Sequence, residues 1–229
     1  GPLFPPEEPT QRITAEPKEA KAPQAVFFVV PGAIGQGDGV GGEERIAAYV
    51  AAGHVIANHS NSHKRLSTTD TAAYLADIDA AEVWLKDRPG YRPWFRFPFL
   101  DEGGKDKAKR DALRAGLVAR GLRNGYVTAE SSDWHLENLT RDAVQAGKTI
   151  DRKALGELYV TWHVEAADFA DAMMRRVTGR QPVQMMLLHE TDLAALHIGD
   201  LVRALRGAGW TVVSADTAYA DPIGKEMPD

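Results

Sequence analysis

His59 and His63 are two candidate metal ligands, four positions apart in the stretch HSNSH. If the chain turns helical after Asn58, both imidazoles lie on one face and can bind one divalent cation. A helical zinc protease would carry glutamate directly after the first histidine, whereas Ser60 stands there. The pair therefore predicts a metal site in another kind of hydrolase, and two polar loop residues are the alternative.

Arg96 lies in the stretch WFRFPFLDEG, at the end of a predicted strand and shortly before Pro98 and Phe99. An arginine in that position can hold a carboxylate through two parallel hydrogen bonds. We expect the proline to fix a rigid turn in which a backbone N–H points into a cleft. The alternative for Arg96 is a surface ion pair with Asp101 or Glu102.

Asp133 and Trp134 in SSDWHLEN, and His189 at the end of MMLLH, form a third group of chemically capable side chains. A carboxylate beside a flat aromatic ring suits contact with a sugar, and core packing is the alternative for the tryptophan. A histidine at a strand end beside an acid can act near neutral pH. This group therefore indicates acid–base chemistry beside a surface for a sugar ring.

Apolar segments alternate with helical segments along the chain, and these elements must position the reactive side chains. The expected strands are residues 25–30, 54–58, 93–98, 124–130, 183–189 and 210–215. The expected helices are 43–53, 67–87, 105–121 and 191–209, and helical stretches at 135–180 form an insertion or a long crossover. The alternation predicts one α/β domain, either an open doubly wound sheet or an incomplete barrel. In both folds functional groups gather at the carboxyl ends of strands, where the arginine, the aspartate at 133 and the histidines at 59 and 189 are expected.

The composition excludes several classes of function. A net charge of −5 gives no basic surplus for nucleic acid or an anionic membrane surface. The chain has no cysteine, which excludes disulfides, thiolate nucleophiles and cysteine metal sites. No stretch approaches the ~18 apolar residues of a membrane span. The first residues, GPLFPPEEPTQR, lack a basic segment followed by an apolar one, so we expect no signal peptide in this chain.

The order of these motifs resembles the polysaccharide deacetylase family, the carbohydrate esterases of the NodB-homology type. HSNSH is similar to the family's metal-binding histidine motif, RFPF to R-x-P-Y/F, SSDW to the D-x-x-D-W region, and LLH to the final L-x-L-H. Four motifs in one order are more specific than any single one. The resemblance implies a distorted, incomplete (β/α) barrel in a single catalytic domain at 25–220, between an N-terminal surface segment at 1–24 and a C-terminal tail at 221–229.

The resemblance also implies roles for the first two motifs. His59 and His63 would bind one divalent metal ion, with zinc as the first expectation and cobalt or nickel as alternatives. Arg96 would orient the catalytic aspartate. The backbone N–H of Phe99 would donate to the oxyanion, and Pro98 would contact the substrate.

The later motifs would complete the site by the same resemblance. His189 would be the general acid, Asp133 would belong to the catalytic group, Trp134 would line the groove, and Leu188 would form an apolar pocket for the acetyl methyl group. The implied partner is an acetylated oligosaccharide or polysaccharide, with either N- or O-acetyl groups, in the periplasm or outside the cell. No nucleic acid, membrane span or protein partner is indicated.

One family motif has no counterpart in this sequence. The T-F-D-D motif, which supplies the third metal ligand and the base aspartate, is absent, and no Asp–Asp pair precedes residue 59. We expect a truncated chain, inactive without those residues; a deliberately shortened chain or a pseudoenzyme would also account for the absence. The leading hypothesis is a metal-dependent deacetylase. The alternatives are a non-catalytic carbohydrate-binding protein on the same scaffold and a metal-dependent amidohydrolase for a non-sugar amide.

Overall fold

A computed structural model describes residues 12, 13, 15, 19 and 22–226 of the chain. The chain forms two compact units, and each is described by itself. The first, Gln24–Tyr126, contains a parallel sheet and is called the sheet unit. The second, Val127–Asp229 with the described residues up to Pro23, consists largely of helices and is called the helical unit. The domain boundaries expected from the sequence stay a prediction.

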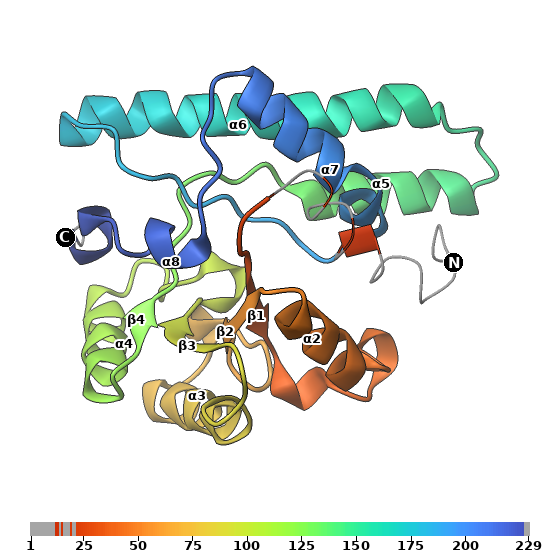
Figure 1. Ribbon diagram of the computed structural model, residues 1–229. Helices are drawn as coiled ribbons and strands as arrows, with labels where there is room; N and C mark the ends of the chain where they lie inside the picture. Colours follow the sequence, from red (N-terminus) through yellow and green to blue (C-terminus); the bar gives the residue numbers. More distant parts are fainter. Residues whose placement is uncertain (1–11, 14, 16–18, 20–21, 227–229) are drawn as a thin grey trace. The chain divides into compact units, whose positions relative to one another are not determined.

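The sheet unit contains four parallel strands in the order of the chain. They are β1 (Val26–Val29), β2 (Val55–Asn58), β3 (Tyr91–Phe95) and β4 (Arg123–Asn124). Helices α2 (Gly42–Ala51), α3 (Thr71–Leu85) and α4 (Lys107–Ala119) connect them and lie around the strands (Figure 1). A doubly wound sheet reverses its strand order at a switch point, whereas this order runs without reversal, as in a (β/α) barrel. The α/β fold class predicted from the sequence is confirmed.

Buried side chains on both the strands and the helices hold the sheet unit together. One cluster joins Phe95 and Phe97 to Tyr74 and Ile78 of α3 and to Leu113 of α4. A second cluster joins β1 and β2 to the carboxyl half of α3. All four residues of β2 are buried, as expected for a strand covered on both faces.

Between residues 127 and 226 the helical unit contains three long α-helices and one short one. They are α5 (Asp133–Gln145), α6 (Arg152–Thr178), α7 (Asp192–Gly207) and α8 (Ala215–Ala218). The first residues of α6 and α7 follow capping side chains: Asp151 accepts from the N–H of Ala154, and Thr191 from that of Ala194. Helices α5, α6 and α7 share one apolar core around Tyr159. Two consecutive helices thus occupy most of the region 135–180.

Three of the predicted strands are wrong in extent or in kind. The strand expected at 124–130 is reduced to Arg123–Asn124, within β4. The one expected at 183–189 forms a single bridge, Ala129 to Met186, in which the N–H of Leu187 donates to the carbonyl of Ala129, while the N–H of Met185 bonds to the hydroxyl of Thr128 at 2.7 Å.

The strand expected at 210–215 is also absent from the described part of the chain. Its first N–H, on Trp210, bonds to the carbonyl of Leu205 and closes the end of α7. Its last residues begin a helix instead, because the Ser214 hydroxyl accepts the N–H of Thr217 and caps α8.

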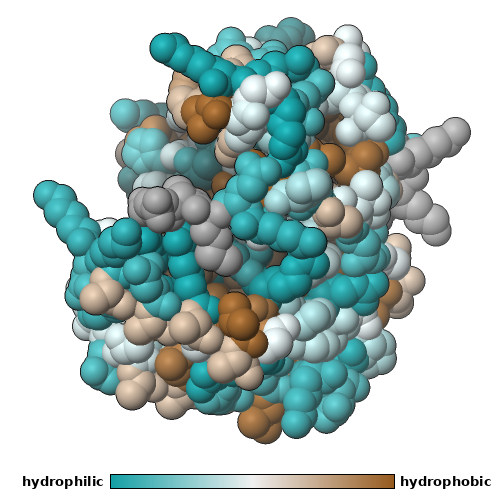
Figure 2. Space-filling view, turned by 90° about the vertical axis from the view of Figure 1, so that its left-hand side faces the viewer, coloured by the Kyte–Doolittle hydropathy of each residue, from teal (hydrophilic) through white to brown (hydrophobic). Residues whose placement is uncertain are grey.

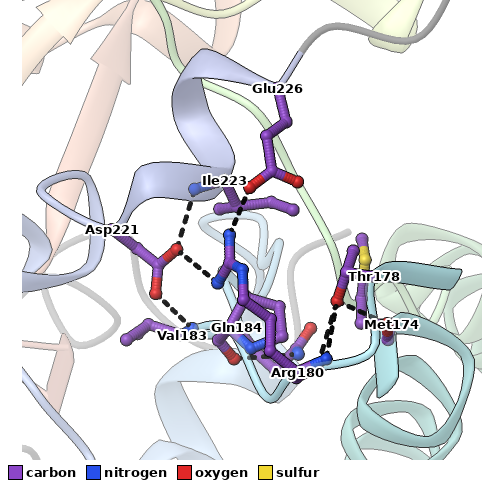
Figure 3. Close-up of polar contacts among 9 residues, drawn as sticks. Met174, Thr178, Arg180, Val183, Gln184, Asp221, Ile223 and Glu226 are labelled. Carbon is purple, nitrogen blue, oxygen red and sulfur yellow. Dashed lines mark hydrogen bonds and ion pairs between the residues drawn. The ribbon is translucent and has the colours of Figure 1, made fainter. Parts of the chain in front are cut away.

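Residues 221–226 are fastened to the residues after α6 by a polar group that we call the C-terminal clamp, made of Arg180, Asp221 and Glu226 (Figure 3). The Arg180 guanidinium donates to Asp221 at 3.2 Å and to Glu226 at 2.7 Å. Asp221 also accepts the N–H groups of Val183 at 2.9 Å and Ile223 at 2.8 Å. Burial acts to raise the pKa of the Asp221 carboxyl, but these donors together hold it below its ordinary value.

The surface is mostly polar on the face drawn in Figure 2, where the hydrophobic residues form small and separate patches. The net charge of −5 and the mean hydropathy of −0.32 agree with that distribution. Among the described residues, no helix combines the length and apolar character that crossing a bilayer requires.

Candidate active site

The HSNSH loop follows β2 and brings its two histidine rings together without a helix. The centroids of the His59 and His63 rings are 4.9 Å apart. The helical turn on which the pairing was expected to depend is wrong, because residues 59–65 have no helical assignment. Instead, Ser60 and His63 both adopt left-handed backbone conformations, with φ of 63° and 54°. Two reversals of the chain thus do what one helical turn would have done.

The hydrogen bond of His59 determines which ring nitrogen can bind a metal. Its Nδ1 lies 2.8 Å from the carbonyl oxygen of Arg96. A carbonyl only accepts, so Nδ1 carries the proton, and in the neutral ring the lone pair is on Nε2. A histidine that binds a metal through one ring nitrogen usually donates the N–H of its other ring nitrogen to a carbonyl or carboxylate oxygen. His59 is therefore in the tautomer that a metal site needs.

Buried polar side chains hold the loop in place beneath these rings. Ser60 is fully buried; its N–H donates to Asn58 Oδ1 at 2.8 Å, and its hydroxyl accepts the N–H of His63 at 3.0 Å. Asp77 on α3 accepts the N–H groups of Asn61 and Ser62 at 3.1 and 3.0 Å. Each of these bonds constrains the backbone on one side of the second histidine.

Arg96 follows β3 directly and is buried, with 7% of its surface exposed. Its guanidinium stacks on the ring of Phe28, 4.0 Å from the centroid, and its Nε donates to the carbonyl of Gly125 at 2.9 Å. The predicted surface partners are engaged elsewhere, since Asp101 accepts from Ser67 and Glu102 from Arg114. The carbonyl of the same arginine orients His59, so both motifs meet at the ends of adjacent strands.

The turn after Arg96 places a strained backbone beside the histidines. Pro98 begins a short 3-10 turn, and Phe99 and Leu100 inside it have φ of 60° and 53°. The Phe99 ring lies 4.6 Å from the ring of His63. Within the described part of the chain the N–H of Phe99 has no acceptor, whereas that of Leu100 bonds to Phe97. The predicted oxyanion donor is thus a backbone N–H available for a ligand.

Asp133 and His189 form a dyad in the helical unit. The carboxylate is the first residue of α5 and has 1% of its side chain exposed, whereas the imidazole has 43% exposed. Asp133 Oδ1 accepts from His189 Nδ1 at 2.6 Å, and Oδ2 accepts the backbone N–H of His189 at 2.7 Å. The buried acid therefore fixes both the position and the tautomer of the ring and leaves Nε2 on the exposed edge.

The two remaining predicted contacts also lie in the helical unit. Trp134 follows the buried acid, with 46% of its surface exposed, so core packing does not account for its ring. Leu188 is half-buried against the core cluster around Tyr159. His59 and Arg96 lie at the ends of β2 and β3, as expected. The expected place at a strand end is wrong for Asp133, which begins a helix, and for His189, which follows an extended segment outside the sheet.

Backbone strain is concentrated at these motifs. Five non-glycine residues in the described chain have positive φ, and all five lie in or next to a predicted motif: Ser60, His63, Phe99, Leu100 and Ser132. Each such conformation costs on the order of 1–3 kcal/mol and persists only where the surroundings hold it, which is typical of active sites. This observation supports the candidate site independently of the motifs.

The residues that sequence reasoning missed are those that support the loop rather than those that reach a ligand. Asn58, Asp77 and Glu82 were not singled out as site residues, although they hold the loop or one another by hydrogen bonds. For Asn58, the amide at the end of a buried apolar strand was an available signal. The two acids gave none, because the sequence identified residues 67–87 only as a helix.

His59 and His63 suit a divalent ion as nitrogen ligands, but they make up only part of a ligand set. Among the described residues, no group of three or more His, Cys, Asp or Glu side chains is placed to hold an ion. The other ligands of an ion held here would be water, substrate or a further acid.

Solved structures with this fold include polysaccharide deacetylases. A polysaccharide deacetylase from Bacillus cereus has a TM-score of 0.64 at 16% identity, covering 90% of this chain and 84% of its own. A family 4 carbohydrate esterase from Streptomyces lividans, in complex with acetate, has a TM-score of 0.59 at 19% identity, covering 92% of this chain and 88% of its own. At these identities the likeness establishes the fold.

A CE4 family pseudoenzyme from Bacillus anthracis shares the fold as well, with a TM-score of 0.58 at 15% identity, covering 94% of this chain and 62% of its own. No significant match is found among curated proteins. The family model for polysaccharide deacetylases matches residues 5–119, half of the 229 residues. The chain therefore belongs to the polysaccharide deacetylase family.

Proposed function

We propose that the chain is a divalent-metal-dependent hydrolase that removes acetyl groups from N- or O-acetylated carbohydrate. The observation that carries the proposal is the pairing of two histidine rings 4.9 Å apart, one of which donates its Nδ1 proton to a backbone carbonyl. This arrangement suits cation binding through Nε2. Membership of the deacetylase family supplies the reaction class.

His59 and His63 would hold the ion, with zinc as the first candidate and cobalt or nickel as alternatives, since the ligand types suit several cations. When bound, such an ion would polarise the acetyl carbonyl and lower the pKa of a bound water, so that a base could take the water's proton and leave hydroxide as the nucleophile. The chain's own contribution on this side is the N–H of Phe99, which would donate to the oxyanion of the tetrahedral intermediate. One such donor is worth about 3–4 kcal/mol of barrier.

The dyad in the helical unit would supply the proton for the departing sugar nitrogen or oxygen. Asp133 holds one proton of His189 on Nδ1, so the imidazolium would donate its other proton, on the exposed Nε2, to the leaving group. Trp134 would offer its ring to a sugar face, and Leu188 would contact the acetyl methyl group. Arg96 would orient a base carboxylate, as the family resemblance implies. The substrate class would place the protein in the periplasm or outside the cell.

A non-catalytic carbohydrate-binding function is the second candidate. It is favoured by one observation: no acidic side chain completes a three-residue ligand group with the two histidines among the described residues. A CE4 family pseudoenzyme also has this fold. Such a protein would bind sugar while the hydrolytic steps are lost.

Two measurements decide between the candidates. The protein is freed of metal with a chelator and reloaded with zinc, cobalt or nickel; metal content and acetate release from acetylated chitooligosaccharide and acetylated xylan are then measured. We expect binding of one ion and metal-dependent acetate release, both lost in His59→Ala and His63→Ala. His135→Ala, which removes an exposed histidine of α5, is the matched control and should bind metal normally.

A protein that binds acetylated glycans, releases no acetate with any metal, and keeps its glycan affinity in His59→Ala and His189→Ala would support the second candidate and contradict the first. Acetate release from small non-sugar amides but not from the glycans would instead indicate an amidohydrolase of another specificity.

A further inference from the structure

A continuous chain of hydrogen bonds leads from helix α3 to the backbone of His63, entirely within the sheet unit. Asn58 Nδ2 donates to Glu82 Oε1 at 2.7 Å. Asn58 Oδ1 accepts the N–H of Ser60 at 2.8 Å, and the hydroxyl of Ser60 accepts the N–H of His63 at 3.0 Å. At the other end, the hydroxyl of Tyr91 donates to Glu82 Oε2 at 2.6 Å.

Asn58 is the link whose orientation matters. It is fully buried at the last position of β2, so water cannot replace its partners. Its NH₂ group faces two acceptors, Glu82 and the carbonyl of Ile78 at 3.1 Å. A carboxylate can only accept, so the amide oxygen must point the other way, toward the N–H of Ser60. The acceptor oxygen of Glu82, together with the carbonyl of Ile78, thus determines which face of the amide meets the loop.

Ser60 in turn depends on that orientation. Both Ser60 and His63 hold left-handed conformations that non-glycine residues rarely adopt. Asp77 fastens the middle of the loop but bonds neither of them, since its partners are Asn61 and Ser62. The bonds between Asn58, Ser60 and His63 therefore constrain the backbone where it reverses.

We propose that Glu82 is a positioning residue for His63, acting through Asn58 and Ser60, and that it thereby sets the affinity of the cation site. The inference rests on the proposed function for its metal, but the positioning itself concerns only the protein. Glu82 touches neither ring, so its effect must pass through the two intervening side chains.

The test compares Glu82→Ala with two matched variants. Glu82→Gln keeps an acceptor for Asn58 and can donate to the hydroxyl of Tyr91, so it should restore the arrangement. Asp79→Ala removes an acid from the same helix, where it pairs with Arg120 on the exposed surface, and should leave the loop unchanged. The first readout is hydrogen exchange of the His63 amide by NMR in metal-free protein. The second is the Kd for zinc, measured by calorimetry.

In Glu82→Ala we expect the His63 amide to exchange about tenfold faster, because its acceptor is no longer held. We expect the Kd for zinc to rise about 10–100-fold, the usual effect of losing a group that orients a metal ligand by hydrogen bonding. Glu82→Gln and Asp79→Ala should stay within about threefold of the unaltered protein in both measurements. Should Glu82→Ala not fold, Glu82→Asp, which keeps the charge but withdraws it from Asn58, should show faster exchange of the same amide.

Unchanged exchange of the His63 amide in Glu82→Ala or Glu82→Asp would overturn the inference, as would an equal effect of Asp79→Ala. If the unaltered protein binds no zinc, cobalt or nickel, the proposed function fails, while the exchange measurement still decides whether Glu82 positions His63.

Discussion

Replacing Asp133 by asparagine changes one atom of a buried side chain and tests the dyad directly. In the structure the carboxylate accepts three hydrogen bonds: two from His189, and one from the N–H of Trp134 at 2.8 Å. Asparagine offers one acceptor oxygen and one NH₂ group. If its oxygen faces the backbone N–H of His189, its NH₂ faces the N–H of Trp134; if it is flipped, its NH₂ faces the backbone N–H of His189.

Either orientation leaves a buried N–H opposite another donor. One unsatisfied buried donor costs on the order of 2 kcal/mol. In a protein of this size, 1 kcal/mol lowers the Tm by about 2–4 °C, so the expected decrease is about 4–8 °C. In the first orientation the imidazole must also move its proton to Nε2, so that Nδ1 can accept. A general acid held in the wrong tautomer loses most of its effect, about 10²–10⁴-fold in rate.

The assay combines thermal unfolding, side-chain NMR of His189 and acetate release. Asp142→Asn is the control, because it makes the same chemical change at an exposed position of the same helix. We expect Asp142→Asn to behave like the unaltered protein. A Tm for Asp133→Asn equal to that of the control, together with an unchanged Nδ1 proton on His189, would show that the carboxylate does not hold the ring as described.

Three further perturbations have expected outcomes. Gly32→Ala would place a Cβ 2.3 Å from the carbonyl oxygen of Asn61. We expect this variant to displace the histidine loop, to lose about 1–3 kcal/mol of stability in urea unfolding, and to bind zinc more weakly. The control Gly207→Ala, which has open space around its Cβ, should lose no stability. In the C-terminal clamp, the lowered pKa of Asp221 stabilises the fold at pH values above the ordinary carboxyl pKa, and this contribution disappears as the pH falls through the lowered value. Asp221→Asn should therefore be less stable at neutral pH, and its stability should decrease less steeply in acid than that of the unaltered protein. Burial lowers the pKa of His163, which is 1% exposed, so as the pH falls the unfolded chain binds the histidine proton before the folded chain does. The free energy of unfolding should therefore decrease as the pH falls through about 6.5. If His163→Gln shows the same pH dependence of the unfolding free energy between about pH 7.5 and 5, this expectation is contradicted.

The sequence by itself determined the repeating part of the fold and the identity of the candidate ligands. Strand and helix periodicity located β1, β2, β3 and the helices between them, because each element buries an apolar face whose spacing is visible in the chain. It also identified the histidine pair, the arginine turn and the acid before Trp134 as chemically capable groups, since residue type and order alone carry that information.

Only the tertiary structure decided how those groups are held. The rings of His59 and His63 meet through a loop with two left-handed residues, and no local pattern predicts such a conformation because its cost is offset by bonds from distant residues. The same holds for the segment 183–189, which pairs through a single bridge and shares a hydrogen bond with the hydroxyl of Thr128. Buried hydrogen bonds between segments far apart in the chain, such as that between Asn58 and Glu82, have no periodicity, and so they become visible only once the chain is folded.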